Sequence, residues 1–305
     1  MNFSHIKGHL AMLGANVMWG LMAPVAKIVM AAGLVSPLLM TDFRIFGAAI
    51  LFWIASLFTR HEKVPTGDLL LLAGAAMLGI VCNQGCYVFG IGLTSPGEAS
   101  IITTTMPLWV MVFAALILGE PITLKKIGGI VLGASGALIL VLNGSRSAVS
   151  AGDNPMLGDI LVLTAQLSYA LYLTFYRNFI RKYSVFTLMK WMFTFASIVV
   201  LPFSVGELAS APWEHFTHKE VFGAAYVVIC ATFLAYIFVM IGQKNLRPTL
   251  VGMYNYVQPI VATSTGIILG LDAFTVYKAM AIVLIFTGVY LVTISKAAPR
   301  PAVGE

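Results

Sequence analysis

Apolar runs of about twenty residues recur along the whole chain and constrain its fold more than any other feature. A run of this length crosses the roughly 30 Å hydrocarbon core of a bilayer as one α-helix. Ten such runs are visible, at 10–31, 38–58, 69–90, 97–118, 127–143, 158–178, 185–206, 221–242, 249–270 and 277–295. Only 10% of the 305 residues are charged, against about 25% in soluble domains. We therefore predict an all-α integral membrane protein.

Lysine and arginine are divided unequally between the two alternating sets of connections. The set that includes both ends of the chain holds thirteen of them, and the other set holds four. Because cytoplasmic connections are enriched in these residues, we predict that both termini are cytoplasmic. The net charge of +6 is scattered over these connections, so we expect no nucleic-acid partner. The first run is too long for the apolar core of a signal peptide and is expected to stay in the mature chain.

The chain contains two copies of one unit of five runs. Residues 96–126 read PGEASIITTTMPLWVMVFAALILGEPITLKK, and residues 248–278 read PTLVGMYNYVQPIVATSTGIILGLDAFTVYK. Aligned without a gap, they pair Pro96 with Pro248, Pro107 with Pro259, Glu120 with Asp272 and Lys126 with Lys278. At a slightly different offset, the front of each half pairs Trp19 with Tyr169 and Lys27 with Arg177. Because five is odd, the second copy must enter the membrane from the opposite side, as in many secondary transporters.

Three stretches give the chain a resemblance to the drug/metabolite transporter superfamily, specifically to its ten-helix EamA-type exporters. They are NVMWG at 16–20, SPLLMTDFR at 36–44 and the block from Pro96 through GEPIT at 119–123 to Gly136. The resemblance covers essentially the whole chain. The second half is looser, with Tyr169 in place of the tryptophan, Thr194 in place of the arginine and Asp272 in place of the glutamate.

This resemblance implies ten transmembrane helices, arranged as two inverted five-helix repeats around a central cavity. The expected division is a first repeat at 1–143, a linker at 144–157, a second repeat at 158–296 and a cytoplasmic tail at 297–305. The family consists of small-metabolite carriers, most often exporters, and amino-acid exporters are among its members. We accordingly expect a multi-pass protein of the bacterial inner membrane.

Polar and aromatic residues interrupt the runs near the predicted midplane. Pro107 and Pro259 hold equivalent positions in the fourth and ninth runs, where each should bend its helix and free a carbonyl. We predict a substrate site beside these two kinks, lined by Asn16, Trp19, Asn83, Tyr87, Thr103, Thr104, Tyr169, Tyr254, Asn255, Tyr256 and Gln258. Amides and rings suit a neutral or zwitterionic metabolite, whose ammonium group the ring faces could hold. The alternative is that these residues only join neighbouring helices.

Ionisable residues form a second group nearer the predicted outer side. They are Lys27, Asp42, Arg44 and Glu98, and a charge at such depth is costly unless it is paired or hydrated. We expect them to form an outer gate. The alternative is a static charge network, or a Lys27 side chain that extends to the interface. Asp42 and Arg44 are two residues apart on one helix, so they should find different partners.

Catalytic signatures are missing from the apolar runs. They contain no HExxH, no GxSxG and no histidine, so we expect neither an enzyme nor a metal or cofactor site. The predicted function is secondary transport, with export as the expected direction, of small neutral or zwitterionic metabolites such as amino acids by alternating access. The expected partners are the substrate and the lipid bilayer, and a monomer is compatible with the sequence. Efflux of nucleosides or amphipathic drugs and a channel-like facilitator remain open as alternatives, as does proton coupling.

Overall fold

The computed structural model describes residues 3–30, 33–94, 99, 102–142, 154–268 and 274–295, and all regular structure in this part of the chain is helical. The first half contains α1 (Phe3–Met30), α2 (Pro37–Leu57), α3 (Thr66–Ala76), the π-helix η1 (Met77–Cys82), α4 (Asn83–Leu93), α6 (Met106–Leu118) and α7 (Leu124–Leu142). The second half contains α8 (Pro155–Phe175), η2 (Phe179–Arg181), α9 (Val185–Ser210), η3 (Trp213–His215), α10 (His218–Val228), the π-helix η4 (Ile229–Leu234), α11 (Ala235–Asn245), α12 (Pro248–Met253), the 3₁₀-helix η5 (Tyr254–Tyr256), α13 (Val257–Ile268) and α14 (Val276–Thr293).

Seven helical stretches among the described residues are long and apolar enough to cross a membrane. They are Leu38–Leu57, Thr66–Gly90, Leu124–Leu142, Met156–Phe175, Val185–Ser210, His218–Asn245 and Val276–Thr293, and α6 is a shorter apolar helix. The predicted all-helical, multi-pass class is thus confirmed in the described part of the chain. The predicted count of ten spans stays a prediction.

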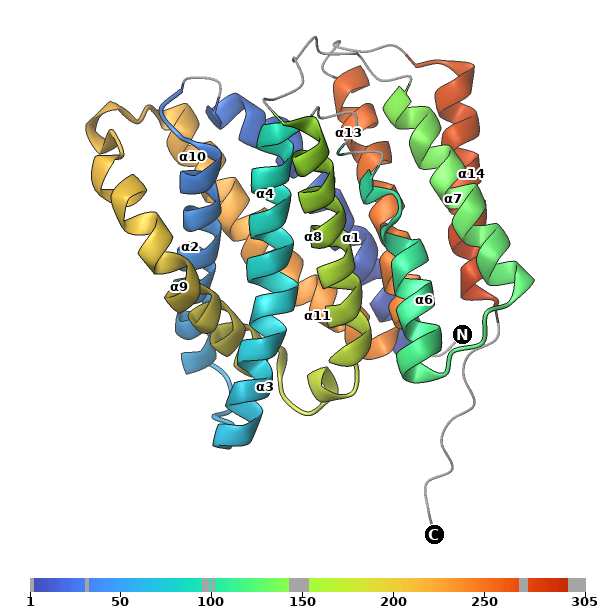
Figure 1. The fold of residues 1–305 in the computed structure, drawn as a ribbon, viewed down its shortest axis with the longest axis horizontal. Coiled ribbons are helices and arrows are strands. Elements are labelled where there is room, and N and C mark those ends of the chain that lie inside the picture. The colour runs from blue at the N-terminus through green and yellow to red at the C-terminus, as the bar shows by residue number, and fades with distance from the viewer. Residues whose placement is uncertain are drawn as a thin grey trace.

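The helices stand side by side in one bundle (Figure 1). The chain enters α1 at the face where α14 ends. We call this the lower face, and it also carries the connections 58–65, 119–123 and 176–184. The opposite, upper face carries the end of α7 and the start of α8. The two halves of the chain therefore begin at opposite faces and run through the bundle in opposite directions.

Serine hydroxyls start the second helix of each half. The Ser36 Oγ accepts a hydrogen bond of 3.0 Å from the Leu39 amide at the start of α2. The Ser184 Oγ accepts one of 3.2 Å from the Thr187 amide at the start of α9. Such caps satisfy amides that have no partner within the helix, and each contributes about 1 kcal/mol. Local sequence therefore determines where these helices begin.

Glycines bring α7 and α14 into backbone contact. A Cβ atom on Gly136 would lie 2.6 Å from the Ala281 carbonyl oxygen, and one on Gly288 would lie 2.4 Å from the Gly129 carbonyl oxygen. Gly136 and Gly288 are equivalent positions of the two halves. Because helices in lipid gain little from hydrophobic burial, close packing through small residues is an important source of their attraction. This pair joins the last helix of one half to the last helix of the other.

Candidate substrate-binding site

Two π-helices interrupt two long helices at equivalent positions. A shift of 152 residues takes Met77 to Ile229 and Cys82 to Leu234, which are the ends of η1 and η4. The same shift takes Pro107 to Pro259. A π-helix widens the turn by one residue and occurs frequently at functional sites. The structure therefore places one kind of distortion at the same point of both halves.

Side chains from α1 and α8 bind carbonyl groups inside the two π-helices. The Trp19 Nε1 of α1 donates to the Ala231 carbonyl of η4 at 2.9 Å. The Ser168 hydroxyl of α8 donates to the Leu78 carbonyl of η1 at 2.7 Å. The change of hydrogen-bonding register in a π-segment leaves carbonyls to be satisfied by such neighbours. Trp19 is thus placed beside η4, and its ring lies 6.0 Å from that of Tyr236 in an edge-on arrangement.

Gln84 and Tyr236 meet in the interior, and they are equivalent residues of the two halves. The Gln84 Nε2 donates to the Tyr236 hydroxyl at 2.7 Å, and both side chains are buried. In an inverted repeat, only residues close to the two-fold axis contact their own equivalents. The Gln84 Oε1 has no hydrogen-bond partner although it is buried. An unused acceptor therefore lies at the interface of the halves.

Arg44 of α2 points toward the same region. Its Nε donates to the Thr232 hydroxyl of η4 at 3.1 Å, and it interacts electrostatically with Tyr87 and Tyr236. No carboxylate of the described residues forms an ion pair with it. The predicted gate residue Arg44 is therefore grouped with the predicted site residues Trp19 and Tyr87.

A chain of amides crosses the interior beside this cluster. The Gln258 Nε2 of α13 donates to the Asn16 Oδ1 of α1 at 2.9 Å and to the Asn255 Oδ1 at 3.2 Å. The Asn16 Nδ2 donates in turn to the Met12 carbonyl at 2.8 Å. Asn255 reaches α6, where its Nδ2 lies 3.2 Å from the Met106 sulfur. Three predicted site residues from both halves thus form one hydrogen-bonded chain.

The equivalent prolines Pro107 and Pro259 each follow a break in a helix. A turn at Thr104 and Thr105 precedes α6, and Pro107 is the second residue of that helix. The 3₁₀-helix η5 precedes α13, and Pro259 is the third residue there. A proline in the first turn removes no helical hydrogen bond. Each of the two predicted runs is therefore discontinuous, with its break directly before the proline.

The remaining predicted site residues are held in other contacts. Tyr256 is only 1% exposed, and its hydroxyl donates to the Thr104 carbonyl at 3.0 Å. Tyr254 contacts His9 of α1, with 2.6 Å between the hydroxyl and Nδ1. The other three are Asn83, which donates to the Ala165 carbonyl at 3.0 Å, Tyr169, which stacks on Tyr172 with ring centroids 5.8 Å apart, and the partly buried Thr103.

The predicted outer-gate residues do not form one group among those described. Asp42 is buried and accepts a hydrogen bond from the Ser204 hydroxyl of α9, whereas Arg44 contacts η4. Their two-residue spacing thus separates their partners, as predicted. The Lys27 side chain and Glu98 lie outside the described residues. A gate made of these four residues stays a hypothesis.

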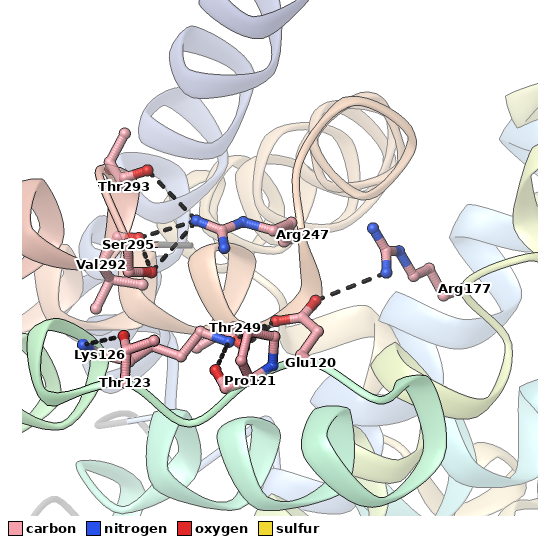
Figure 2. A network of polar contacts seen from close by, with 10 residues as sticks. All are labelled: Glu120, Pro121, Thr123, Lys126, Arg177, Arg247, Thr249, Val292, Thr293 and Ser295. Atoms are coloured by element: carbon pink, nitrogen blue, oxygen red, sulfur yellow. Dashed lines mark hydrogen bonds and ion pairs between the residues drawn. The ribbon is translucent and has the colours of Figure 1, made fainter. Parts of the chain in front are cut away.

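Glu120 is the centre of a second polar network, at the lower face (Figure 2). The Lys126 Nζ lies 2.9 Å from its Oε2, and the Arg177 Nη1 lies 3.6 Å from its Oε1. The Thr249 hydroxyl donates to Oε2 at 3.1 Å. Glu120 and Lys126 belong to the first half, whereas Arg177 and Thr249 belong to the second. This network therefore joins the two halves at the face where α1 begins and α14 ends.

Both halves of the sequence match one family, the EamA-like transporter family, at residues 6–142 and 156–294. The chain belongs to the EamA-like transporter family. The two matched ranges correspond to the two oppositely directed halves of the bundle. Because the family and the relatives are transporters, this EamA protein is a membrane transporter and not an enzyme.

Relatives agree with this assignment over nearly the full length, and a solved structure shares the fold. The chain is 28% identical over 299 residues to an Escherichia coli protein named "Probable amino-acid metabolite efflux pump", with 93% of each chain covered. It is 21% identical over 291 residues to an uncharacterized transporter of Bacillus subtilis, covering 95% of this chain and 86% of the relative. A solved structure with 19% identity has the same fold, with a TM-score of 0.77 over 95% of this chain and 96% of the other.

Several residues outside the predicted site join these networks, and two of them, Gln84 and Tyr236, are polar groups that the sequence places near the predicted midplane. The full set is Gln84, Thr232 and Tyr236 in the interior and Glu120, Lys126 and Arg177 at the lower face. The repeat register contains a usable signal for two of them, because Gln84 and Tyr236 are equivalent positions. Some polar residues lie inside apolar runs and occupy equivalent positions in the two halves of an inverted repeat. Such residues are candidates for positions near the two-fold axis of the repeat.

Proposed function

We propose that this EamA protein is a secondary transporter that exports small metabolites bearing a carboxylate and an apolar part, with amino acids as the main class. The observation that carries the proposal is Arg44, a cation inside the bundle without an ion-pair partner among the described residues. An ionisable residue within a membrane is costly, and such residues commonly mark substrate pathways. A substrate carboxylate would supply the missing counter-charge.

The surroundings of Arg44 suit the other parts of an amino acid. The rings of Trp19 and Tyr236, 6.0 Å apart, offer an apolar surface and π-faces for a side chain or an ammonium group. The unused Gln84 Oε1 offers a hydrogen-bond acceptor to an N–H donor. An acceptor, a cation and rings in one cluster favour a zwitterion over a purely apolar substrate. The name of the Escherichia coli relative supports the same substrate class.

The position of the site between the halves supports alternating access. Residues of both halves contribute to it, and the amide chain Asn16–Gln258–Asn255 passes from one half to the other. Both broken helices, α6 and α12–α13, meet beside it, as in transporters whose sites use discontinuous helices. In this proposal, the Glu120–Arg177 contact between the halves separates when the site opens to the lower face. In this proposal the lower face is cytoplasmic, both termini lie there, and the membrane is the bacterial inner membrane.

Counterflow in proteoliposomes tests the proposal. Vesicles loaded with unlabelled L-phenylalanine, L-alanine or uridine are supplied with a trace of the same labelled compound. Wild-type protein should exchange at least one amino acid with saturable kinetics, because a carrier binds its substrate at a finite number of sites. Arg44→Gln should lower this exchange about tenfold or more, since a charge-assisted hydrogen bond to the carboxylate is lost.

Matched variants separate substrate binding from folding. Asn16→Leu breaks the amide chain and should also reduce exchange. Asn245→Leu is the control, because the Asn245 Nδ2 donates only to a carbonyl of its own helix, Ile241. All variants are checked for monodispersity before reconstitution. Exchange of uridine alone would refute the proposed substrate class but would support a carrier mechanism. Unsaturable flux would indicate a channel. Wild-type exchange by Arg44→Gln would refute the role of Arg44.

A further inference from the structure

Asp42 of α2 is a buried carboxyl group that the proposed substrate site does not use. It is 0% exposed, and no lysine or arginine of the described residues forms an ion pair with it. In the described part of the chain its Oδ1 contacts the Ser204 hydroxyl of α9, and its Oδ2 has no hydrogen-bond partner. Burying an unpaired charge costs far more than burying a neutral group. These surroundings therefore suit a carboxyl that carries its proton.

The hydrogen bonds around Ser204 accommodate this proton. The Ser204 Oγ contacts the Asp42 Oδ1 and lies 3.2 Å from the Val200 carbonyl oxygen. A hydroxyl has one proton to donate, whereas an ionised carboxylate and a carbonyl only accept. If Asp42 is protonated, its Oδ1 donates to the Ser204 Oγ, and the Ser204 proton is then free for Val200. Each of the two protons has an acceptor in this arrangement.

Glu207 of α9 connects this carboxyl with the upper face. It follows Ser204 by three residues, so both lie on the same side of α9, and it interacts electrostatically with Asp42. It is half-buried and accepts a hydrogen bond from the Ser36 hydroxyl, at the start of α2. Because α9 runs toward the upper face, Glu207 lies about 4.5 Å nearer to that face than Ser204. A proton from that side can thus reach Asp42 by way of Glu207.

The other neighbours of α2 contribute no further charge at Asp42. The helices α4, α10 and η4 also pack on α2, and among the described residues Glu207 is the titratable group that acts on Asp42. Arg44, two residues along α2, donates to Thr232 of η4 and so faces a different side. Whether Asp42 holds a proton therefore depends on Glu207 and on the contact between α2 and α9.

We infer that Asp42 is the proton-binding site through which this transporter couples substrate export to proton entry. Helix α2 belongs to the first half and α9 to the second, so the contact between them changes when the halves move. While the two helices are packed, Asp42 keeps its proton. When they separate, water reaches the carboxyl, its O–H bond breaks, and the proton passes to water. Proton binding then favours one conformation over the other, which is the requirement for coupling. The inference rests on the proposed function for the substrate that is exchanged.

Uptake driven by a pH gradient tests the coupling. Proteoliposomes with an acidic interior are diluted into neutral buffer that contains a trace of the labelled amino acid exchanged in counterflow, with potassium and valinomycin on hand to clamp the membrane potential. Wild-type protein should accumulate the label above its external concentration, and a protonophore should abolish this accumulation. Asp42→Asn should keep counterflow, because exchange needs no net proton movement, and should lose accumulation. Asp68→Asn is the matched control, since Asp68 pairs with Lys182 away from this site, and should accumulate like wild type.

Infrared spectroscopy of protein labelled with ¹³C in the aspartate carboxyls gives a readout that needs no substrate. Wild-type protein at neutral pH should show the C=O stretch of a protonated aspartate, and Asp42→Asn should lack this band. Asp42→Ser replaces Asp42→Asn in both experiments if the latter is not monodisperse.

The outcomes separate this inference from the proposed function. If no amino acid is exchanged in counterflow, the proposed function fails, and the infrared band alone decides whether Asp42 binds a proton. Counterflow without accumulation in wild type, accumulation by Asp42→Asn, or loss of counterflow in monodisperse Asp42→Asn would each overturn the coupling role. A wild-type spectrum without the protonated-aspartate band would overturn the inference at its first step.

Discussion

Trp19 shows how much of the site depends on one hydrogen bond. Its indole nitrogen satisfies the Ala231 carbonyl inside η4, and its ring packs against Tyr236. The residue therefore fixes both the shape of the π-helix and one side of the proposed site. A ring without the N–H group would keep the second role and lose the first.

Trp19→Phe is expected to lower the free energy of unfolding by about 1–3 kcal/mol, because the buried carbonyl loses its donor. It should also reduce counterflow. The matched control is Trp53→Phe, since the Trp53 Nε1 donates to Thr194 at the exposed surface of the bundle, where the change should cost about 0.5 kcal/mol or less. Thermal unfolding in detergent measures both. Equal losses of stability in the two variants would show that the hydrogen bond to Ala231 contributes no more to stability than the one to Thr194.

At the residue scale, sequence reasoning identifies the kinds of residue in the interior but not their partners. Asn255 and Tyr256 are adjacent and both were predicted to line the site, yet Asn255 joins the amide chain whereas Tyr256 is buried against α7. The reason is that η5 and the start of α13 carry polar or aromatic side chains at several consecutive positions. Neighbouring residues of a helix point in different directions, and the sequence alone does not reveal which of them faces the interior.

At the scale of the helices, two of the glycines of α7 have opposite surroundings. A Cβ atom on Gly133 would lie 2.5 Å from the Tyr256 Cε2, whereas one on Gly128 would meet nothing within 4 Å. Gly133 therefore makes room for a ring that anchors η5. Gly128 has no comparable packing role.

Gly133→Ala is expected to destabilise the protein by about 1–3 kcal/mol, as overpacking of a filled interior does. Gly128→Ala in the same helix should be neutral or should stabilise the protein by about 0.4–1 kcal/mol, because alanine has less freedom in the unfolded chain. Thermal melting of both variants in the same detergent measures the difference. Comparable melting temperatures for the two variants would contradict the proposed packing of Tyr256.

The ends and the interruptions of helices differ in how well sequence predicts them. Apolar runs predict where the seven long apolar helices of the described residues lie, because apolar length is a direct requirement of the bilayer. The π-helices η1 and η4 were not foreseen, since their residues, MLGIVC and ICATFL, contain neither proline nor a polar cluster. Such a distortion is stabilised by contacts from neighbouring helices, which no local pattern records.

For the whole molecule, the arrangement of the faces leads to a test of orientation. The lysine- and arginine-rich set of connections predicted from the sequence includes those of the lower face, so that face should be cytoplasmic. Green fluorescent protein fused after Arg300 should fluoresce. Alkaline phosphatase, which needs disulfides and therefore the periplasm, should be active after His215 and inactive after Arg60. The reversed pattern would place both termini outside and would exchange the roles given to the two faces.

The global architecture was the most predictable part. Two equal units of an odd number of runs must enter from opposite faces, and α1 and α8 do so. The Glu120 network was less predictable, although its members pair in the repeat with Asp272, Lys278 and Lys27. Ion pairs between distant segments depend on the final packing of the bundle, which follows from all helices together.

The matched π-helices also carry historical information. A π-helix of this kind arises when one residue is inserted into an α-helix, and η1 and η4 occupy equivalent positions of the two halves. If the two π-helices had arisen separately, two independent insertions would have had to occur at the same position in both copies. One insertion in an ancestor of half this length, before its gene was duplicated and fused, accounts for both. The distortion is then older than the two-repeat chain, and the ancestral unit of half this length already contained it when two copies had to assemble in opposite orientations.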